Sequence, residues 1–447
     1  MRPRQKTILY VAMQNSPHTA GWINLAASYG ASLHFFPLDG NSPNAGLRGV
    51  VLYQPKVADN WARRSVLKLD RWITYSFRRI QPTLGLNSAA SPHKTGLPPG
   101  LKERRFSVLP SEAGPPDLLS TGKIRLGESP NEAQILYGPW ILAALIRQLK
   151  PTLIHSMEFQ HAGYLVLKTK EVYGRRFPPW LATNWGSDVF FFGRSPDHAA
   201  QLRRLFKEID YYSCECTRDV TLAREFGFAG PVLPVLPNSG GLNLDHVRRL
   251  HSGIPTSRRK TIMVKGYQHF AGRAMTALKV LERFACQLQG YEIVMYSASA
   301  EPLAAARDLA ARDVLNIKAS GTLERVPHED MLAAFGRARI YLGISISDAI
   351  STSALEAMAM GAFPIQTNTS CCDEWFEDAK GGFIVPPDDF ELICDRFQVA
   401  LSDDKLVDNA ASINWTTVCN RLDEHVLRTK VQDFYDQVFS DAESASR

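Results

Sequence analysis

The stretch ISISDAISTSALEAMAMGAFPIQT, residues 344–367, decides the fold of this chain. It begins at the end of an apolar, strand-like run and passes through a polar turn that contains Asp348. It then continues into a helix of small residues and returns at Gly361 to a second apolar run. A strand, a helix and a strand in this order form the repeating unit of a parallel sheet covered by helices. The turn therefore lies at the carboxyl end of a strand, where ligands bind in such sheets.

The same alternation of strands and helices extends in both directions from this stretch. Strand-like runs rich in β-branched and aromatic residues recur from residue 6 to residue 236, and again from residue 261 to residue 367. The sequence PNSGG at residues 237–241 interrupts the pattern, and we expect a hinge there. The chain is thus predicted to be an α/β protein of two doubly wound domains that face each other across a cleft.

The predicted boundaries follow from these interruptions. We expect an N-terminal domain over residues 1–240, a C-terminal domain over 241–414, and helices over 415–447 that tie the two together. Residues 85–130, which contain SAASPHKTGLPPG and SEAGPP, are predicted to form a long loop insertion. A helix over 132–149 and a strand over 232–236 complete the expected N-terminal domain.

Composition excludes several classes of protein. The chain has 447 residues, of which 45% are hydrophobic and 21% charged, so it can bury a large core and is not mainly disordered. The longest apolar run, residues 137–146, is too short to cross a bilayer, and no signal-peptide cleavage site follows the basic start. The seven cysteines do not indicate a disulfide framework, and Cys214 and Cys216 lack a second pair of ligands at matching spacing. We expect reduced thiols and a cytoplasmic protein.

Charge is distributed unevenly between the two halves. Residues 1–240 carry 29 lysines and arginines against 17 aspartates and glutamates, whereas the remainder carries 22 against 28. Residues 62–80 also combine an apolar stripe at helical spacing with interleaved arginines and lysines, which is typical of a basic amphipathic helix. Two interpretations stay open: this helix packs on the sheet, or it lies on the anionic inner face of a membrane as a peripheral anchor.

The polar turn and the helix after it carry the chemistry. A helix that begins near Ser353 at the end of a strand offers free N–H groups and a positive dipole end, which suit a diphosphate. Asp348 and Glu356 flank the turn, and their carboxylates can accept hydrogen bonds from sugar hydroxyls. The alternative is that Ser353 and Glu356 form only a capping box, in which each satisfies the other's backbone donor.

The segment SDAISTSALEAMAMGAFPIQT, followed by DEWFEDAKGGFIVPPDD, resembles the donor-site signature of family 4 retaining glycosyltransferases. The resemblance implies the GT-B fold of two facing Rossmann-like domains. It implies that Glu356 holds the nucleotide ribose and that Asp348, which replaces the usual glutamate, meets the donor sugar. It places the diphosphate on the backbone of Thr352, Ser353 and Ala354. The further donor-side residues it implies are Lys265 and Arg273, which neutralise the diphosphate, with Gly321 and Leu323 beside the base.

The N-terminal domain supplies the predicted acceptor side. MEFQHAGY puts Glu158 and His161 just after one strand, and NWGSD puts Ser187 and Asp188 after the next. Relatives often carry a histidine before Gly-Ser-Asp, where this chain has Trp185, so His161 is the candidate for the missing imidazole. His18, in the loop expected over residues 15–21, is a further candidate on the acceptor side.

These observations predict a retaining glycosyltransferase that moves a sugar from a nucleoside diphosphate donor to a hydroxyl acceptor, a glycan or a glycolipid, in cell-surface polysaccharide or glycolipid synthesis. Basic side chains and helix N-termini can carry the diphosphate, so we expect neither a metal nor a cofactor. Two alternatives remain: a nucleotide-sugar epimerase of the same fold, and a non-catalytic, membrane-associated nucleotide-sugar-binding protein. No nucleic-acid reader motif is present in the basic half, so we expect no nucleic-acid partner.

Overall fold

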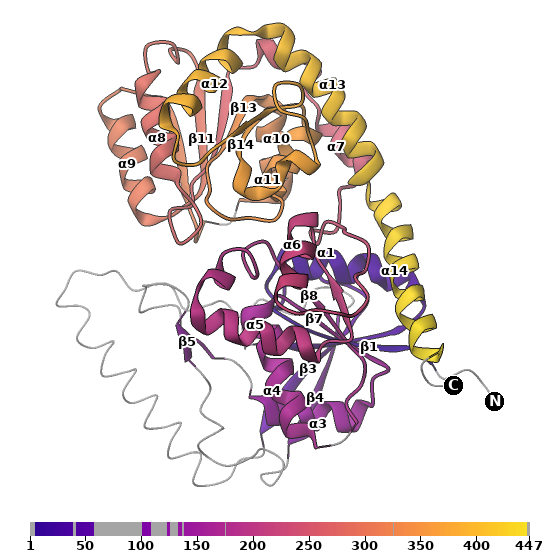
Figure 1. Ribbon diagram of the computed structural model, residues 1–447. Coiled ribbons are helices and arrows are strands. Elements are labelled where there is room, and N and C mark those ends of the chain that lie inside the picture. The colour runs from indigo at the N-terminus through magenta and orange to yellow at the C-terminus, as the bar shows by residue number, and fades with distance from the viewer. Residues whose placement is uncertain are drawn as a thin grey trace, which may run out of the picture.

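The structure is a computed structural model in which the chain forms two α/β bodies (Figure 1). Each body is a parallel sheet flanked by helices, as the sequence predicts. The predicted basic helix over 62–80 lies outside the described residues. These are 5–38, 42–57, 101–108, 123–125, 133–135, 138–174, 176–324 and 326–444.

The N-terminal body contains a seven-stranded sheet in the order β4-β3-β2-β1-β7-β8-β9. All its neighbouring strands are parallel. Its strands are β1 (Thr7–Ala12), β2 (Ser32–Pro37), β3 (Val51–Val57), β4 (Lys102–Val108), β7 (Leu153–Met157), β8 (Trp180–Thr183) and β9 (Tyr211–Ser213). Its helices are α1 (Pro17–Ala26), α3 (Pro139–Leu149), α4 (Tyr164–Tyr173), α5 (Pro196–Glu208) and α6 (Thr217–Glu225).

The C-terminal body contains a six-stranded parallel sheet in the order β12-β11-β10-β13-β14-β15. This is the order 3-2-1-4-5-6 of the doubly wound dinucleotide-binding fold, whose switch point lies between its first and fourth strands. Its strands are β10 (Thr261–Lys265), β11 (Glu292–Ala298), β12 (Ile317–Gly321), β13 (Ala338–Gly343), β14 (Phe363–Thr367) and β15 (Phe383–Val385). Its helices are α7 (Leu244–Leu250), α8 (Ala274–Arg283), α9 (Ala300–Ala311), α10 (His328–Arg337), α11 (Thr352–Ala359) and α12 (Phe390–Ser402).

Three local predictions were wrong. The expected loop over 85–130 contains β4, which extends the main sheet by pairing with β3, and β5 (Lys123–Arg125), which pairs with β6 (Ala133–Ile135). Helix α3 begins at Pro139 rather than near residue 132, because a glycine and a proline at its start set the first turn. The strand expected over 232–236 is reduced to one bridge between Tyr212 and Val232, because the prolines around it cannot donate to a ladder.

The two C-terminal helices connect the bodies along one side (Figure 1). Helix α13 (Asp404–Arg421) packs against α11 and β14 of the C-terminal body, and α14 (Glu424–Ser444) packs against α1 of the N-terminal body. The Tyr435 hydroxyl of α14 is buried against the N-terminal sheet, where it lies 2.8 Å from the hydroxyl of Tyr10 and accepts a hydrogen bond from Trp22 Nε1 at 2.9 Å. The chain therefore returns to the body in which it began.

Both sheets direct the carboxyl ends of their strands toward the space between the bodies. In the N-terminal sheet the strand order reverses between β1 and β7, and in the C-terminal sheet between β10 and β13. Ligands of open α/β sheets bind at such switch points. Among the described residues, no helix is both long enough and apolar enough to cross a bilayer.

Candidate active site

A cleft of about 390 Å³ lies where the two switch points face each other. Its wall includes segments that follow β1, β7, β8 and β9 in one body and β10 and β13 in the other, together with Tyr296 of β11. Nine of the residues predicted from the sequence lie on it, although they are spread over more than 330 positions of the chain. They are His18, Glu158, His161, Ser187, Asp188, Lys265, Asp348, Thr352 and Ser353.

Helix α11 begins two residues earlier than the capping-box interpretation requires. Its N-cap is Ser351, and no side chain caps it, so Ser353 and Glu356 do not form the predicted box. The backbone N–H groups of Thr352 and Ser353 make no hydrogen bond to any described residue. Ala354 differs, because its N–H donates to the Ser351 carbonyl at 2.9 Å and its side chain is fully buried. Two amides, rather than the three predicted, are therefore available for an anion in the cleft.

Glu356 faces a histidine that the sequence analysis did not single out. Its Oε1 lies 2.7 Å from Nε2 of His328, the first residue of α10. Hydrogen bonding to Glu356 raises the pKa of His328 above its usual value, although burial opposes the shift. Glu356 is nearly buried and does not line the cleft. A ligand that reaches Glu356 must therefore extend past the N-terminus of α11 and share the carboxylate with His328.

Lys265, the last residue of β10, is the one permanently cationic side chain among the described residues that line the cleft. Its Nζ lies 3.6 Å from Asp348 Oδ2. Burial alone would lower the pKa of Lys265, but the charge of Asp348 raises it above its usual value, so the lysine stays protonated. Arg273 does not line the cleft: its guanidinium donates to the carbonyls of His269 and Gly272 in its own loop. Of the two predicted cations, the structure brings only the lysine to the cleft.

The segment after β7 holds Glu158 and His161 in a single π-helical turn, Phe159–Gly163. Glu158 has a φ of 80°, and its carboxylate accepts hydrogen bonds from the backbone N–H groups of His161 and Ala162. His161 Nδ1 lies 2.9 Å from Glu158 Oε1, which fixes the ring and directs its Nε2 edge away from the carboxylate. Backbone strain and π-turns concentrate at functional sites, and this segment lines the cleft.

Asp188 supports the N-terminal wall more than it faces a ligand. Its Oδ2 accepts hydrogen bonds from the backbone N–H groups of Trp185 and Phe159, at 2.7 and 2.9 Å, and joins the ends of β7 and β8. Burial, then the nearby charge of Glu158, raises the pKa of Asp188 well above its usual value. This shift favours the protonated form of Asp188.

His18 lies in the first turn of α1, which begins at Pro17, so the loop expected over 15–21 is in fact mostly helix. Its ring packs against that of Trp185, with 5.5 Å between ring centroids. Burial lowers the pKa of His18 although the charge of Asp348 opposes the shift, so the imidazole is neutral near pH 7. Trp185 therefore stands where relatives often carry a histidine, and its indole ring packs on the imidazole of His18.

Contacts across the cleft hold the two bodies together. The hydroxyls of Ser187 and Ser347 lie 2.9 Å apart, and Arg218 Nη2 donates to the Asp348 carbonyl at 3.0 Å. A Cβ on Gly186 would lie 2.4 Å from Ala349 N and 2.5 Å from Asp348 Oδ1. The turn after β8 and the turn after β13 therefore approach as closely as glycine allows.

The polar residues of the cleft that sequence reasoning missed include Glu215 and Tyr296. Burial raises the pKa of Glu215 to about 8, and the charge of Asp348 adds to the shift. Glu215 follows β9, so its position at a strand end was a signal in the sequence. Gly321 and Leu323, predicted beside the base, end β12 and start the next turn outside this cleft, and Leu323 is 90% exposed.

Comparisons with known proteins agree with this arrangement. Residues 304–413 match the model of a family described as glycosyl transferases group 1. The fold resembles that of sucrose-phosphate synthase from Thermosynechococcus elongatus, with a TM-score of 0.61 at 14% identity over 98% of this chain and 100% of that one. It also resembles HepE from Anabaena, solved in complex with UDP-glucose, with a TM-score of 0.60 at 11% identity over 97% of this chain and 99% of that one.

A glycosyltransferase from Rickettsia africae is similar as well, with a TM-score of 0.57 at 15% identity over 98% and 99% of the two chains. No curated protein matches the chain by sequence. The segment 304–413, which contains Asp348 and α11, thus matches the model of glycosyl transferases group 1, and the chain as a whole has the GT-B fold.

Proposed function

We propose that this protein is a retaining glycosyltransferase of the family 4 type, which transfers a sugar from a nucleoside diphosphate to a hydroxyl acceptor. The single observation that carries the proposal is the convergence of Lys265 and the free amides of Thr352 and Ser353 on one interdomain cleft. A lysine ammonium and a helix N-terminus are the groups that bind a diphosphate without a metal. The family match of residues 304–413 supports the same interpretation.

In this proposal the C-terminal body binds the donor. The diphosphate lies between Lys265 and the start of α11, and the donor sugar reaches Asp348 and His161. The ribose lies toward Glu356, with His328 beside it. UDP-glucose is the first donor to test, because HepE, which shares the fold, was solved with it.

The reaction we propose is a front-face displacement. The acceptor oxygen bonds to the anomeric carbon as the bond from that carbon to the β-phosphate oxygen breaks, and the acceptor proton moves to the departing phosphate. Lys265 and the two amides stabilise the negative charge that grows on the leaving group, and such preorganised charge is usually the largest contribution to catalysis. The cleft holds both reactants together, and no enzyme nucleophile is needed.

The acceptor enters from the N-terminal side of the cleft. Phe192 and Phe270 belong to opposite bodies, their ring centroids lie 5.3 Å apart, and Phe270 is 46% exposed. Aromatic rings at the mouth of a polar cleft suit the apolar faces of sugar rings. This supports a glycan or the sugar of a glycolipid as acceptor, in cell-surface polysaccharide or glycolipid synthesis on the cytoplasmic side of a membrane.

The test is incubation of the purified chain with UDP-, GDP- and ADP-hexoses and a panel of glycan acceptors. We expect release of the nucleoside diphosphate together with an α-configured product from an α-configured donor, measured by NMR. Conversion of the donor sugar without any acceptor would favour the epimerase, and tight binding without turnover across the panel would favour the non-catalytic binding protein. Lys279→Met, on the exposed face of α8, is the control for Lys265→Met.

A further inference from the structure

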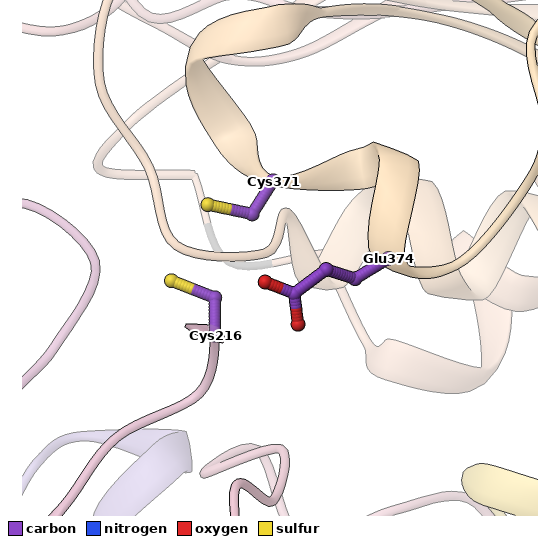
Figure 2. Close-up of side chains that lie close together, drawn as sticks. All are labelled: Cys216, Cys371 and Glu374. Carbon is purple, nitrogen blue, oxygen red and sulfur yellow. The ribbon is translucent and has the colours of Figure 1, made fainter. Parts of the chain in front are cut away.

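A second cluster of reactive side chains lies between the two bodies, outside the cleft. Cys216 follows β9 in the N-terminal body, whereas Cys371 and Glu374 belong to the turns between β14 and β15 in the C-terminal body. Their two sulfur atoms and one carboxylate oxygen all lie within 4.8 Å of one another. Figure 2 shows the three side chains directed into one shared space. The sequence separates Cys216 from Cys371 by 155 positions, so no spacing motif could reveal this meeting.

The cluster is buried and has its own small core. Cys216 is 1% exposed and Cys371 is 6% exposed, and together with Ala349 they form a group separate from the large hydrophobic cores. The two thiols are close enough to hydrogen-bond to each other. Ala349 follows Asp348 directly, so this cluster lies immediately behind the turn that carries Asp348 into the cleft. None of the three chemical groups lines the cleft itself.

The surroundings act on the thiols in both directions: the hydrogen bond with Cys371, and then burial, raises the pKa of the Cys216 thiol, whereas a helix N-terminus and two arginines lie close by. Cys216 is the N-cap of α6, a nine-residue helix, and a helix N-terminus lowers the cost of a thiolate. The Arg218 guanidinium, two residues after Cys216, donates to the carbonyls of Thr369 and Asp348, each at 3.0 Å. Arg421 donates to the Glu374 carbonyl. Both arginines are half-buried, and Arg218 also forms an ion pair with the buried Asp219 at 2.9 Å, so part of its positive charge is balanced before the three groups bind a cation.

The carboxylate of Glu374 is already oriented. Its Oε1 accepts a hydrogen bond from the Thr217 N–H at 2.7 Å, across the boundary between the bodies. A carboxylate held by a backbone donor through one oxygen presents the other oxygen to a cation, and such outer hydrogen bonds are a regular feature of metal sites. The donor set of two thiolates and one carboxylate belongs to zinc chemistry rather than to that of magnesium or calcium.

We propose that Cys216, Cys371 and Glu374 bind one zinc-class divalent cation, with water as the fourth ligand, and that this ion fastens the two bodies together behind the Asp348 turn. Binding exchanges two thiol protons for the cation, so the site tightens as pH rises. This role is distinct from that of the cleft, where Lys265 and the α11 amides serve the diphosphate. It also revises the expectation that no metal binds this chain, since the ion joins the bodies and touches no substrate.

The test uses the full chain, kept reduced with a phosphine, stripped by a chelator and then titrated with Zn²⁺ alone. We expect one zinc per chain by elemental analysis and a rise in Tm on zinc addition, because a cation that binds only the folded state stabilises it. Cys216→Ser and Cys371→Ser should each abolish both effects. Cys286→Ser removes an exposed cysteine outside the cluster and should bind zinc as the original chain does.

Co²⁺ provides a readout that does not depend on whether the variants fold. Two thiolate ligands give intense thiolate-to-cobalt charge-transfer absorption in the original chain, and Glu374→Gln should keep this absorption while it weakens binding. The proposal is overturned if the reduced chain takes up no zinc, if cobalt shows no thiolate absorption, or if Cys216→Ser leaves the zinc content unchanged. Loss of two free thiols in the chain purified without reductant, with no metal uptake after reduction, would identify the pair as a disulfide switch and would also overturn it.

Discussion

Lys265 Nζ lies 3.6 Å from Asp348 Oδ2, at the switch point of the C-terminal sheet, between the end of β10 and the turn after β13. Each side chain is about one quarter exposed, so the pair faces the cleft without being fully solvated. The carboxylate keeps the lysine protonated and places its charge opposite the amides of α11. A donor diphosphate that binds here competes with Asp348 for the lysine and frees the carboxylate for the hydroxyls of the donor sugar.

Lys265→Met should reduce kcat/KM for sugar transfer by about 10²- to 10³-fold, because the charge that develops on the leaving phosphate loses its cation. The measurement is release of nucleoside diphosphate under initial-rate conditions. Lys279→Met should retain both the rate and the Tm of the original chain. Equal rates for Lys265→Met and the original chain would remove the lysine from the mechanism.

His161→Ala should lower kcat by about 10²-fold while the Kd for the nucleoside diphosphate stays unchanged, because the proposed arrangement puts the ring against the donor sugar rather than the phosphates. Glu158→Gln should reproduce part of this loss by releasing Nδ1 of the ring. Calorimetry gives the Kd and product NMR gives the rate. His425→Ala, at an exposed position on α14, is the matched control. A changed Kd with an unchanged kcat in His161→Ala would contradict the role proposed for His161.

Glu215 should make donor binding dependent on pH. Its pKa of about 8 means that it is largely neutral near pH 7 and gains a negative charge, unfavourable to a diphosphate, as pH rises through that value. Because the folded pKa is raised, the folded state binds the extra proton, and the free energy of unfolding falls as pH rises from the unfolded value toward 8. Glu215→Gln should remove both trends, as followed by calorimetry and by Tm at several pH values. Parallel pH profiles for the two proteins would refute the shift.

The contact of His328 with Glu356 should stabilise the fold in mildly acidic solution. The folded pKa of His328 is raised, so its contribution is fully present below the unfolded value, about 6.5, and is lost as pH rises through the folded value. Glu356→Gln should therefore lose more stability at about pH 6 than at about pH 9. Chemical denaturation at both pH values measures the difference. A loss that is the same at both would mean that the histidine is uncharged in the folded state.

Gly186→Ala should lower kcat/KM by about 10²-fold, because its Cβ meets backbone and carboxylate atoms of the Asp348 turn and must push the two bodies apart. Gly46 lies in an exposed loop, where an added Cβ would meet only the Asn44 side chain. Gly46→Ala should therefore leave kcat/KM unchanged. Sugar transfer and small-angle scattering together distinguish a wider cleft from an unfolded chain. Unchanged transfer by Gly186→Ala would mean that this approach is not needed for turnover.

The site could be predicted from the sequence only in part, and particular residues show why. Asp348 and Thr352 were found because they follow a strand directly, and parallel strands end at one edge of a sheet. Arg273 was expected beside Lys265 on resemblance, but its guanidinium is taken up by carbonyls of its own loop. His328 was missed because nothing near it in the sequence indicates that α10 would bring it to Glu356.

The sequence by itself determined the two parallel α/β bodies and the turn at residues 344–353, because hydrophobic periodicity and strand–helix alternation are local properties of the chain. Tertiary structure alone decided which side chains meet across the bodies: Ser187 with Ser347, and Cys216 with Cys371. These contacts depend on how one sheet lies against the other. That arrangement is fixed by long-range packing, such as that of Tyr435 against Tyr10, to which no short segment of sequence corresponds.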